Sequence, residues 1–123
     1  MKLRILNDSI RLRLSQTEVD IFGEKGCVSA EIAFGTNRLK YTVAALADTK
    51  DVTANFANNE IIVGIPSEMA DKWMDPTEVG FENKDQSQMR VLVEKDFQCL
   101  HKRPGEDESD SFPNPQATHN KTK

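Results

Sequence analysis

Four positively charged side chains near the start of the chain alternate with apolar ones. Lys2 and Arg4 precede a turn-forming Asn-Asp pair, and Arg11 and Arg13 follow it, each flanked by Leu or Ile. A period of two predicts a β-hairpin whose charged side chains all project from one face. Like charges on neighbouring strands are unfavourable unless a negative group compensates. Because arginine binds phosphate oxygens bidentately, a phosphate or polyphosphate is one such group.

The four cations Lys2, Arg4, Arg11 and Arg13 form a basic stripe, and its interpretation depends on Lys40 and on three glutamates. Lys40 extends the stripe if its own strand lies nearby. Glu31, Glu82 and Glu94 project from the corresponding side of other predicted strands, where they can form ion pairs on a solvated sheet face. Such a face is one interpretation, and a contact with a protein or nucleic acid is another. The third is an anion-binding site formed by Lys2, Arg4, Arg11, Arg13 and Lys40.

Five residues are candidate metal ligands. Cys99 and His101 are separated by one residue, so a strand would place thiol and imidazole on one face, as a zinc ligand pair requires. A structural zinc site needs two more ligands, and the sequence has no second Cys/His pair, so an ordinary packed thiol is the alternative. The acidic candidates are Glu31, Glu82 and Glu94, which beside the cations would suit a metal-dependent enzyme of phosphate chemistry.

Composition limits the classes of partner. The 123 residues have room for one domain. Lys and Arg number 16 against 20 Asp and Glu, a net charge of −4, which disfavours duplex nucleic acid as a ligand. No apolar run approaches the ~18 residues of a membrane span, and the N-terminus has no export signal. With two cysteines, we expect a cytoplasmic protein with reduced thiols.

The alternation and two helix starts predict the elements that position these residues. Ser15-Gln16-Thr17-Glu18 is a capping-box pattern, and Gly23 or Gly26 would end the helix that it begins. Pro66-Ser67-Glu68 begins a second helix. Each helix is flanked by two predicted hairpins, so the order ββαββ occurs twice.

The two halves can be aligned, which predicts an internal duplication. At a spacing of 51, the apolar positions of the hairpins coincide and Phe22 falls on Trp73, giving pseudo-repeats 1–48 and 52–99. Two generic hairpins that agree by chance are the alternative. We therefore expect an α+β fold, mainly antiparallel β with two short helices, in duplicated ββαββ halves with pseudo-two-fold symmetry. An eight-stranded sheet of this kind would curl or close into a barrel.

Composition changes after Arg103. Residues 104–123 are rich in Glu, Asp, Ser, Pro and Asn, so we expect a single domain over 1–103 and a polar, acidic, flexible tail. An acidic tail is commonly solvated. The alternatives are that it folds back onto Arg11 and Arg13 or docks on a partner.

Two resemblances bear on function. Read from Ile10, the strand order resembles that of the CYTH-type triphosphate-tunnel enzymes, but residues 10–14 and 61–65 lack their Glu-x-Glu-x-Lys strand. Element order alone transfers no activity. The string Val93-Glu94-Lys95-Asp96-Phe97-Gln98-Cys99-Leu100, followed by Glu-Asp-Glu and Phe-Pro-Asn-Pro, resembles a small family of uncharacterised bacterial proteins from Met1 through Pro115. This second resemblance implies a stand-alone domain of unknown function without assigned catalytic residues.

Our leading interpretation is a small non-enzymatic binding or interaction module for an anionic, phosphate-containing ligand on the basic sheet face. The metal-dependent enzyme of phosphate chemistry is the alternative, and a structural partner subunit using strand edges or the tail is a third. The sequence requires no cofactor, although a divalent metal would serve the enzyme. Oligomeric state stays open.

Overall fold

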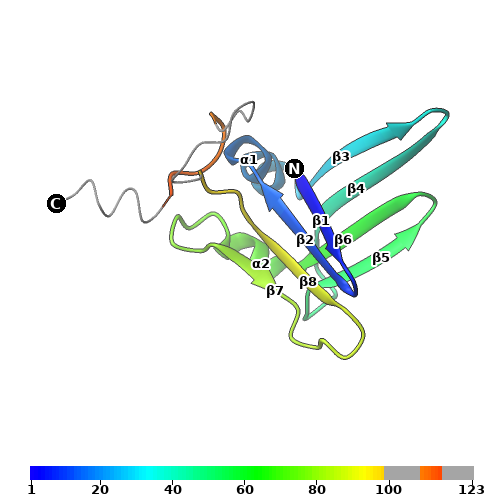
Figure 1. Ribbon diagram of the computed structural model, residues 1–123. Coiled ribbons are helices and arrows are strands. Elements are labelled where there is room, and N and C mark those ends of the chain that lie inside the picture. Colours follow the sequence, from blue (N-terminus) through cyan, green and yellow to red (C-terminus); the bar gives the residue numbers. More distant parts are fainter. Residues whose placement is uncertain (99–108, 115–123) are drawn as a thin grey trace.

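A computed structural model describes residues 1–98 and 109–114 as an α+β arrangement of two four-stranded sheets with two helices (Figure 1). The α+β class and the two helices confirm the sequence prediction. In chain order the elements are β1 (Lys2–Leu6), β2 (Ser9–Leu14), α1 (Gln16–Lys25), β3 (Cys27–Phe34), β4 (Asn37–Leu46), β5 (Thr53–Ala57), β6 (Glu60–Pro66), α2 (Ser67–Lys72), β7 (Gly80–Glu82) and β8 (Arg90–Lys95).

Each sheet takes one hairpin from each half of the chain. Sheet A has the order β1-β2-β8-β7, and sheet B has the order β3-β4-β6-β5. Consecutive strands pair as antiparallel hairpins, whereas the two central pairs, β2 with β8 and β4 with β6, are parallel. The sheets are therefore mixed, and the halves are interlocked.

The expected eight-stranded barrel is wrong. Because each sheet has one apolar face, the two sheets bury these faces against each other instead of closing on themselves. The buried apolar set comes from both sheets and both helical segments: Ile10, Leu12, Leu14, Val19, Phe22, Val28, Val43, Val52, Val63, Ile65, Ala70, Trp73, Val91 and Val93.

Three aromatic side chains occupy the helical end of this core. Trp73, which follows α2 directly, is fully buried and meets Phe22 of α1 edge-on with ring centroids 5.6 Å apart. Phe81 of β7 meets the other side of the indole at 5.9 Å. The indole N–H donates to the Val79 carbonyl oxygen at 3.1 Å, so the polar atom of Trp73 is satisfied.

Local signals in the sequence set the ends of α1. The Ser15 hydroxyl accepts from the Glu18 amide at 3.3 Å, and the Glu18 carboxylate accepts from the Ser15 amide at 3.0 Å, which completes the predicted capping box. Of the two glycines considered, Gly26 ends the helix, with a φ of 81° that glycine adopts without a Cβ penalty.

Part of the segment predicted as a tail, residues 109–114, lies against the body. The Gln16 amide donates to the Asp110 carbonyl oxygen at 2.9 Å, and the Phe112 ring lies 5.9 Å from that of Phe97. Phe112 supplies an apolar contact that the polar composition of the segment does not predict. The expectation of a solvated tail therefore does not describe residues 109–114, and the rest of the segment lies outside the described residues.

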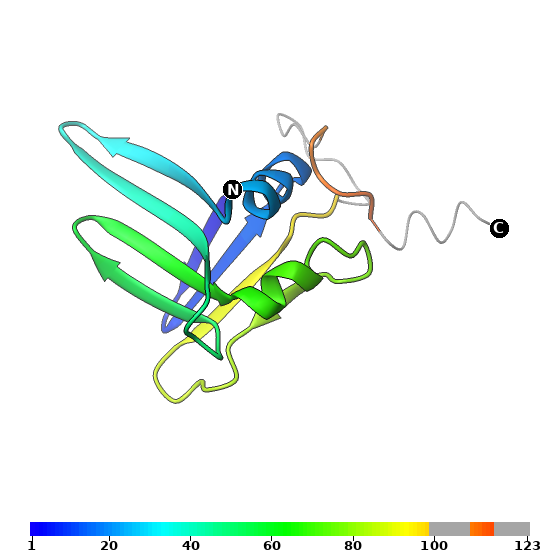
Figure 2. The same ribbon diagram turned by 180° about the vertical axis from the view of Figure 1, so that it is seen from behind.

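The two sheets diverge towards one end of the molecule. Both views show the β3–β4 and β5–β6 hairpins extending away from sheet A, with their turns on the side opposite the helices (Figures 1 and 2). Within the described residues, no helix is long and apolar enough to cross a membrane.

Candidate anion-binding face

The first hairpin places its four cations on one face of sheet A. In the β1–β2 register Lys2 lies opposite Arg13, and Arg4 lies opposite Arg11. Their apolar neighbours along the strands point to the other face, where Ile10, Leu12 and Leu14 are buried in the core. The structure thus brings these four predicted site residues together.

A fifth cation, Arg90, joins this face from β8. Arg90 pairs with Ser9 in the parallel β2–β8 register, two positions before the pair formed by Arg11 and Leu92. Arg90 was not predicted as part of this face, because alternation within one strand does not reveal which distant strand lies beside it. We define the basic face as the outward side chains of Lys2, Arg4, Arg11, Arg13 and Arg90.

Lys40 does not extend the basic face, because its strand β4 belongs to sheet B. Its ammonium lies 3.8 Å from the Glu60 carboxylate. Glu31 pairs with Lys40 in the β3–β4 register, and its carboxylate accepts from Arg38 at 2.5 Å. Lys40 and Glu31 therefore belong to the ion pairs of the other sheet.

Four of the five cations on the basic face have carboxylate partners. Arg11 Nε donates to Glu94 Oε1 at 2.6 Å. Asp96, just after β8, is buried and lies 2.9 Å from the Lys2 ammonium and 4.0 Å from Arg13. The role of Asp96 was likewise not predicted from the sequence.

Arg90 is fixed by the fourth of these pairs. Its Nε and Nη2 donate to the two oxygens of Glu82 at 3.0 and 3.2 Å. This bidentate contact, helped by the Gln86 amide, lowers the pKa of Glu82 below its ordinary value, so the carboxylate stays charged. The guanidinium is thereby held at the edge of the basic face.

Arg4 differs from its neighbours. It is exposed, and no carboxylate of residues 1–98 or 109–114 forms an ion pair with it. It borders a surface hollow of about 310 Å³ that also includes Ser9 and two further arginines. The complete lining is Arg4, Leu6, Ser9, Ile10, Arg11, Arg90 and Leu92.

The three candidate metal ligands that the structure describes are not brought together. Glu82 and Glu94 share the outer face of sheet A, but each accepts hydrogen bonds from an arginine, and Glu31 lies on sheet B. In the part of the chain that the structure describes, no three His, Cys, Asp or Glu side chains gather as metal ligands. Cys99 and His101 lie outside the described residues.

Lys95, the last residue of β8, points into the molecule instead of onto the basic face. It is 4% exposed, its ammonium donates to the Asp75 carbonyl oxygen at 3.0 Å, and it lies 5.3 Å from the centre of the Phe112 ring. Burial lowers the pKa of Lys95, and the nearby Asp75 and Glu78 oppose this shift. Its contacts connect β8 to the 109–114 segment.

Comparison with known proteins identifies one matching family. The family is described as a family of unknown function (DUF7009), and its profile matches residues 1–116. No curated protein and no solved structure shows significant similarity to the chain. The comparisons therefore carry no activity to the basic face.

Proposed function

Because the chain belongs to this family of unknown function, we propose a function from the geometry of its own residues. The protein is a small binding module that holds an anionic, phosphate-containing ligand in the hollow of the basic face. The observation that carries this proposal is Arg4, an arginine without a carboxylate partner among the described residues, beside Arg11 and Arg90.

The charge balance of the face supports an anion. Five cations face three carboxylates, those of Glu82, Glu94 and Asp96, so the face keeps a surplus of two positive charges. The carboxylates orient Arg11 and Arg90, which lowers the entropy lost when both contact a ligand. A phosphate can accept from Arg4 without breaking any ion pair.

The size of the hollow favours a small ligand over a polymer. Its 310 Å³ lies at the lower end of the ~300–1,000 Å³ range of ligand pockets. Leu6 and Leu92 add apolar surface, and Ser9 adds a hydroxyl. A phosphate or diphosphate group on a small organic body matches this lining.

Thermal unfolding of the full chain with orthophosphate, pyrophosphate, polyphosphate and nucleotides tests the proposal. A ligand at 100 times its Kd stabilises the folded state by about 2.7 kcal/mol. We expect at least one of these compounds to raise the midpoint of the wild type and to lose this effect in Arg4→Ala. Arg38→Ala is the matched control, since Arg38 is an exposed arginine of sheet B.

Two results would reject the proposal. One is a wild-type midpoint that none of the compounds shifts. The other is an equal loss in Arg4→Ala and Arg38→Ala, because that would indicate general charge screening and no site. The metal-dependent alternative would need a shift that appears only when a divalent metal is added.

We also infer that the two halves arose by duplication. The β1–β2 register, from Lys2–Arg13 to Leu6–Ser9, becomes the β5–β6 register, from Thr53–Gly64 to Ala57–Glu60, when 51 is added to every number. The central parallel pairs are related in a similar way. Adding 51 to Ser9 gives Glu60 and subtracting 50 from Arg90 gives Lys40, and Glu60 and Lys40 form the first β6–β4 pair. An experimental structure in which residues 2–46 fail to superpose on 53–95 would contradict this inference.

Within this duplication, β7 aligns with β3 at a different spacing from the hairpins. Gly80 pairs with Glu94, and Cys27 pairs with Ala44, so β7 corresponds to β3 at a spacing of 53 and not 51. This places Phe81 on Val28, and both contact the core.

The domain boundary after residue 103 and a cytoplasmic location stay predictions, the latter to be checked by cell fractionation.

A further inference from the structure

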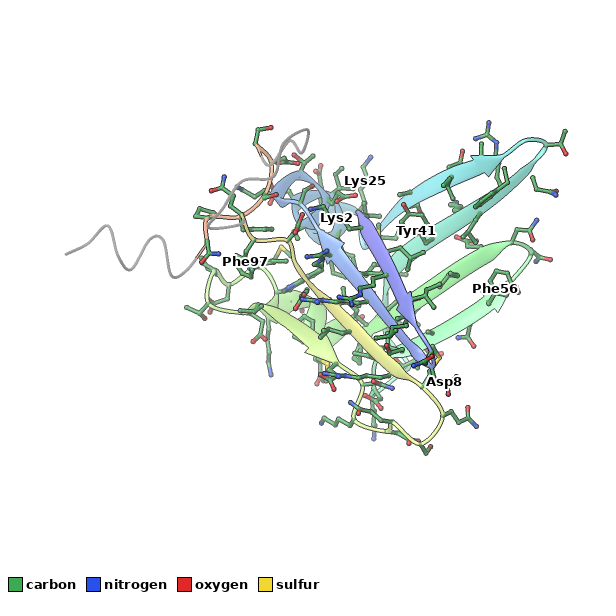
Figure 3. All side chains as sticks on the ribbon, viewed as in Figure 1. Lys2, Asp8, Lys25, Tyr41, Phe56 and Phe97 are labelled. Carbon is green, nitrogen blue, oxygen red and sulfur yellow. The ribbon has the colours of Figure 1, made fainter. Side chains whose placement is uncertain are left out.

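The face of sheet B that points towards sheet A is covered at only one end. Near the helices its residues are buried, as Val43 and Val63 show with 0% exposure. Towards the hairpin turns, Ile32 is 48% exposed, Phe34 60% and Phe56 67%. Figure 3 shows Phe56 on the extending part of sheet B, beyond Tyr41. The core is therefore open at this end of the molecule.

Sheet A contributes the opposite wall of a groove. Ile5 of β1 points to the core side yet is 63% exposed. Together with Leu39, Phe56 and Ile61 it lines a groove of about 500 Å³ between the first hairpin and sheet B. Asp8, labelled at the hairpin turn in Figure 3, supplies the charge at its rim.

We propose that a second copy of the chain covers this surface in a symmetric dimer. We define the apolar face as Ile5, Ile32, Phe34, Leu39, Phe56 and Ile61. Ile61 packs directly against the buried core, so the apolar face continues the core without a polar break. Obligate dimer interfaces have this character, since they resemble a domain core cut in half.

The charge pattern favours an identical partner. The core-side positions of β3, β4, β5 and β6 hold no Asp, Glu, Lys or Arg, whereas Glu31, Arg38, Lys40 and Glu60 lie on the opposite face of sheet B. A two-fold axis brings the same patch of both copies together. Because these positions of sheet B carry no charge, the two copies can do this without placing like charges of sheet B in contact, and Asp8 is the single charged residue that lines the groove.

The area is sufficient for two copies. An aromatic side chain can bury about 150–250 Å², so Phe34 and Phe56 each leave on the order of 100–150 Å² uncovered. With Ile5 and Ile32 the exposed apolar area reaches roughly 400–500 Å², typical of a functional patch on a monomer. Because only about 56–58% of such an interface is apolar, a patch of this size corresponds to roughly 700–900 Å² per partner once its polar rim is included, close to the ~800 Å² of a stable interface.

The mass of the full chain in solution, measured by light scattering and sedimentation across a dilution series, tests the proposal. We expect twice the 13.8 kDa of one chain for the wild type. Ile5→Asp and Phe56→Asp should halve the mass. Leu6→Asp is the matched control, because Leu6 follows Ile5 directly, is similarly exposed at 57% and points to the outer face of sheet A. It should keep the dimer, as should Arg4→Ala.

Folding of each variant is checked through the fluorescence of the fully buried Trp73. If an Asp variant unfolds, Phe34→Ser at the end of β3 replaces it, with the same expected loss of mass. A wild type of 13.8 kDa at every concentration would overturn the proposal. So would a dimer that survives both Ile5→Asp and Phe56→Asp, or one that only Leu6→Asp dissociates. A monomer that binds an apolar dye through Phe56 would assign the face to another occupant.

Discussion

Arg4 and Arg11 have the same side chain at directly facing positions of β1 and β2, yet their surroundings make them chemically different. Arg11 is 38% exposed and donates to Glu94, so an incoming anion competes with a carboxylate already in place. Arg4 has no such competitor among the described residues. The affinity of the basic face for an anion therefore depends more on Arg4, while Arg11 orients the site.

Asp51, before β5, shows how one carboxylate can hold two loops together. Its two oxygens accept from the amides of Val52, Lys84 and Asp85 at 2.9, 2.8 and 3.1 Å. The Lys84 amide is the main cause that lowers the pKa of Asp51 from its ordinary 3.8, against a smaller opposing effect of burial. These bonds join the β4–β5 connection to the β7–β8 loop.

Asp51→Asn should lower the free energy of unfolding by about 1 kcal/mol at neutral pH, because charged hydrogen bonds are lost at a partly exposed site. Since the folded pKa is depressed, the stabilisation is complete above the unfolded value of 3.8 and is lost as the pH falls through the folded value. Urea unfolding at several pH values should therefore show the two proteins converging in acid. Asp20→Asn, on the exposed surface of α1, is the control, and a constant difference down to low pH would contradict this account.

At the scale of the element, what is local in the chain could be predicted and what is distant could not. The Asn7-Asp8 turn, the Ser15 cap and the β2 alternation each depend on residues within a few positions of one another. The parallel pairing of β2 with β8 joins residues about eighty positions apart, and alternation has the same period in every strand. For this reason four cations of the basic face were predictable, whereas the presence of Arg90 on this face and the position of Lys40 on the other sheet were not.

The 109–114 segment acts as an added cap for α1. The Asp110 carboxylate accepts from the Thr17 amide at 3.3 Å and from its hydroxyl at 3.0 Å. Backbone bonds between Gln98 and Phe112 and between Phe112 and Asp96 anchor the segment beside the end of β8. The first turn of α1 thus depends on residues nearly a hundred positions later.

Phe112→Ala should loosen this cap. The side chain is half-buried against Phe97 and beneath the Lys95 ammonium, so we expect a loss of about 1–2 kcal/mol, less than the 3–5 of a fully buried phenylalanine. Hydrogen exchange at the Gln16 and Thr17 amides, which donate to Asp110, should accelerate more than exchange at the Val63 amide in β6. Unchanged exchange at the first two amides would show that the segment does not stabilise α1.

For the whole molecule, the sheet order makes the two halves depend on each other. Sheet A takes β1 and β2 from the first half and β7 and β8 from the second, and sheet B divides in the same way. The closest aromatic contact of the core, between Phe22 and Trp73, also crosses from one half to the other. Neither half can form either sheet or close its aromatic cluster alone, since an isolated two-stranded hairpin is marginal in water.

Separate chains of residues 1–50 and 51–123 should therefore be unfolded alone and fold when mixed. We expect the mixture to recover the far-ultraviolet circular dichroism of the intact chain and the blue-shifted emission of a buried Trp73, in proportion to the limiting fragment. A break between Gly35 and Thr36, inside the β3–β4 hairpin, is the informative comparison. This break separates β3 from β4, so the two strands must pair between separate chains. The recovered circular dichroism and Trp73 emission should therefore be weaker. If 51–123 alone buried Trp73 as a monomer, the halves would not share a core, and the interlocked order of the strands would not be what stabilises this fold.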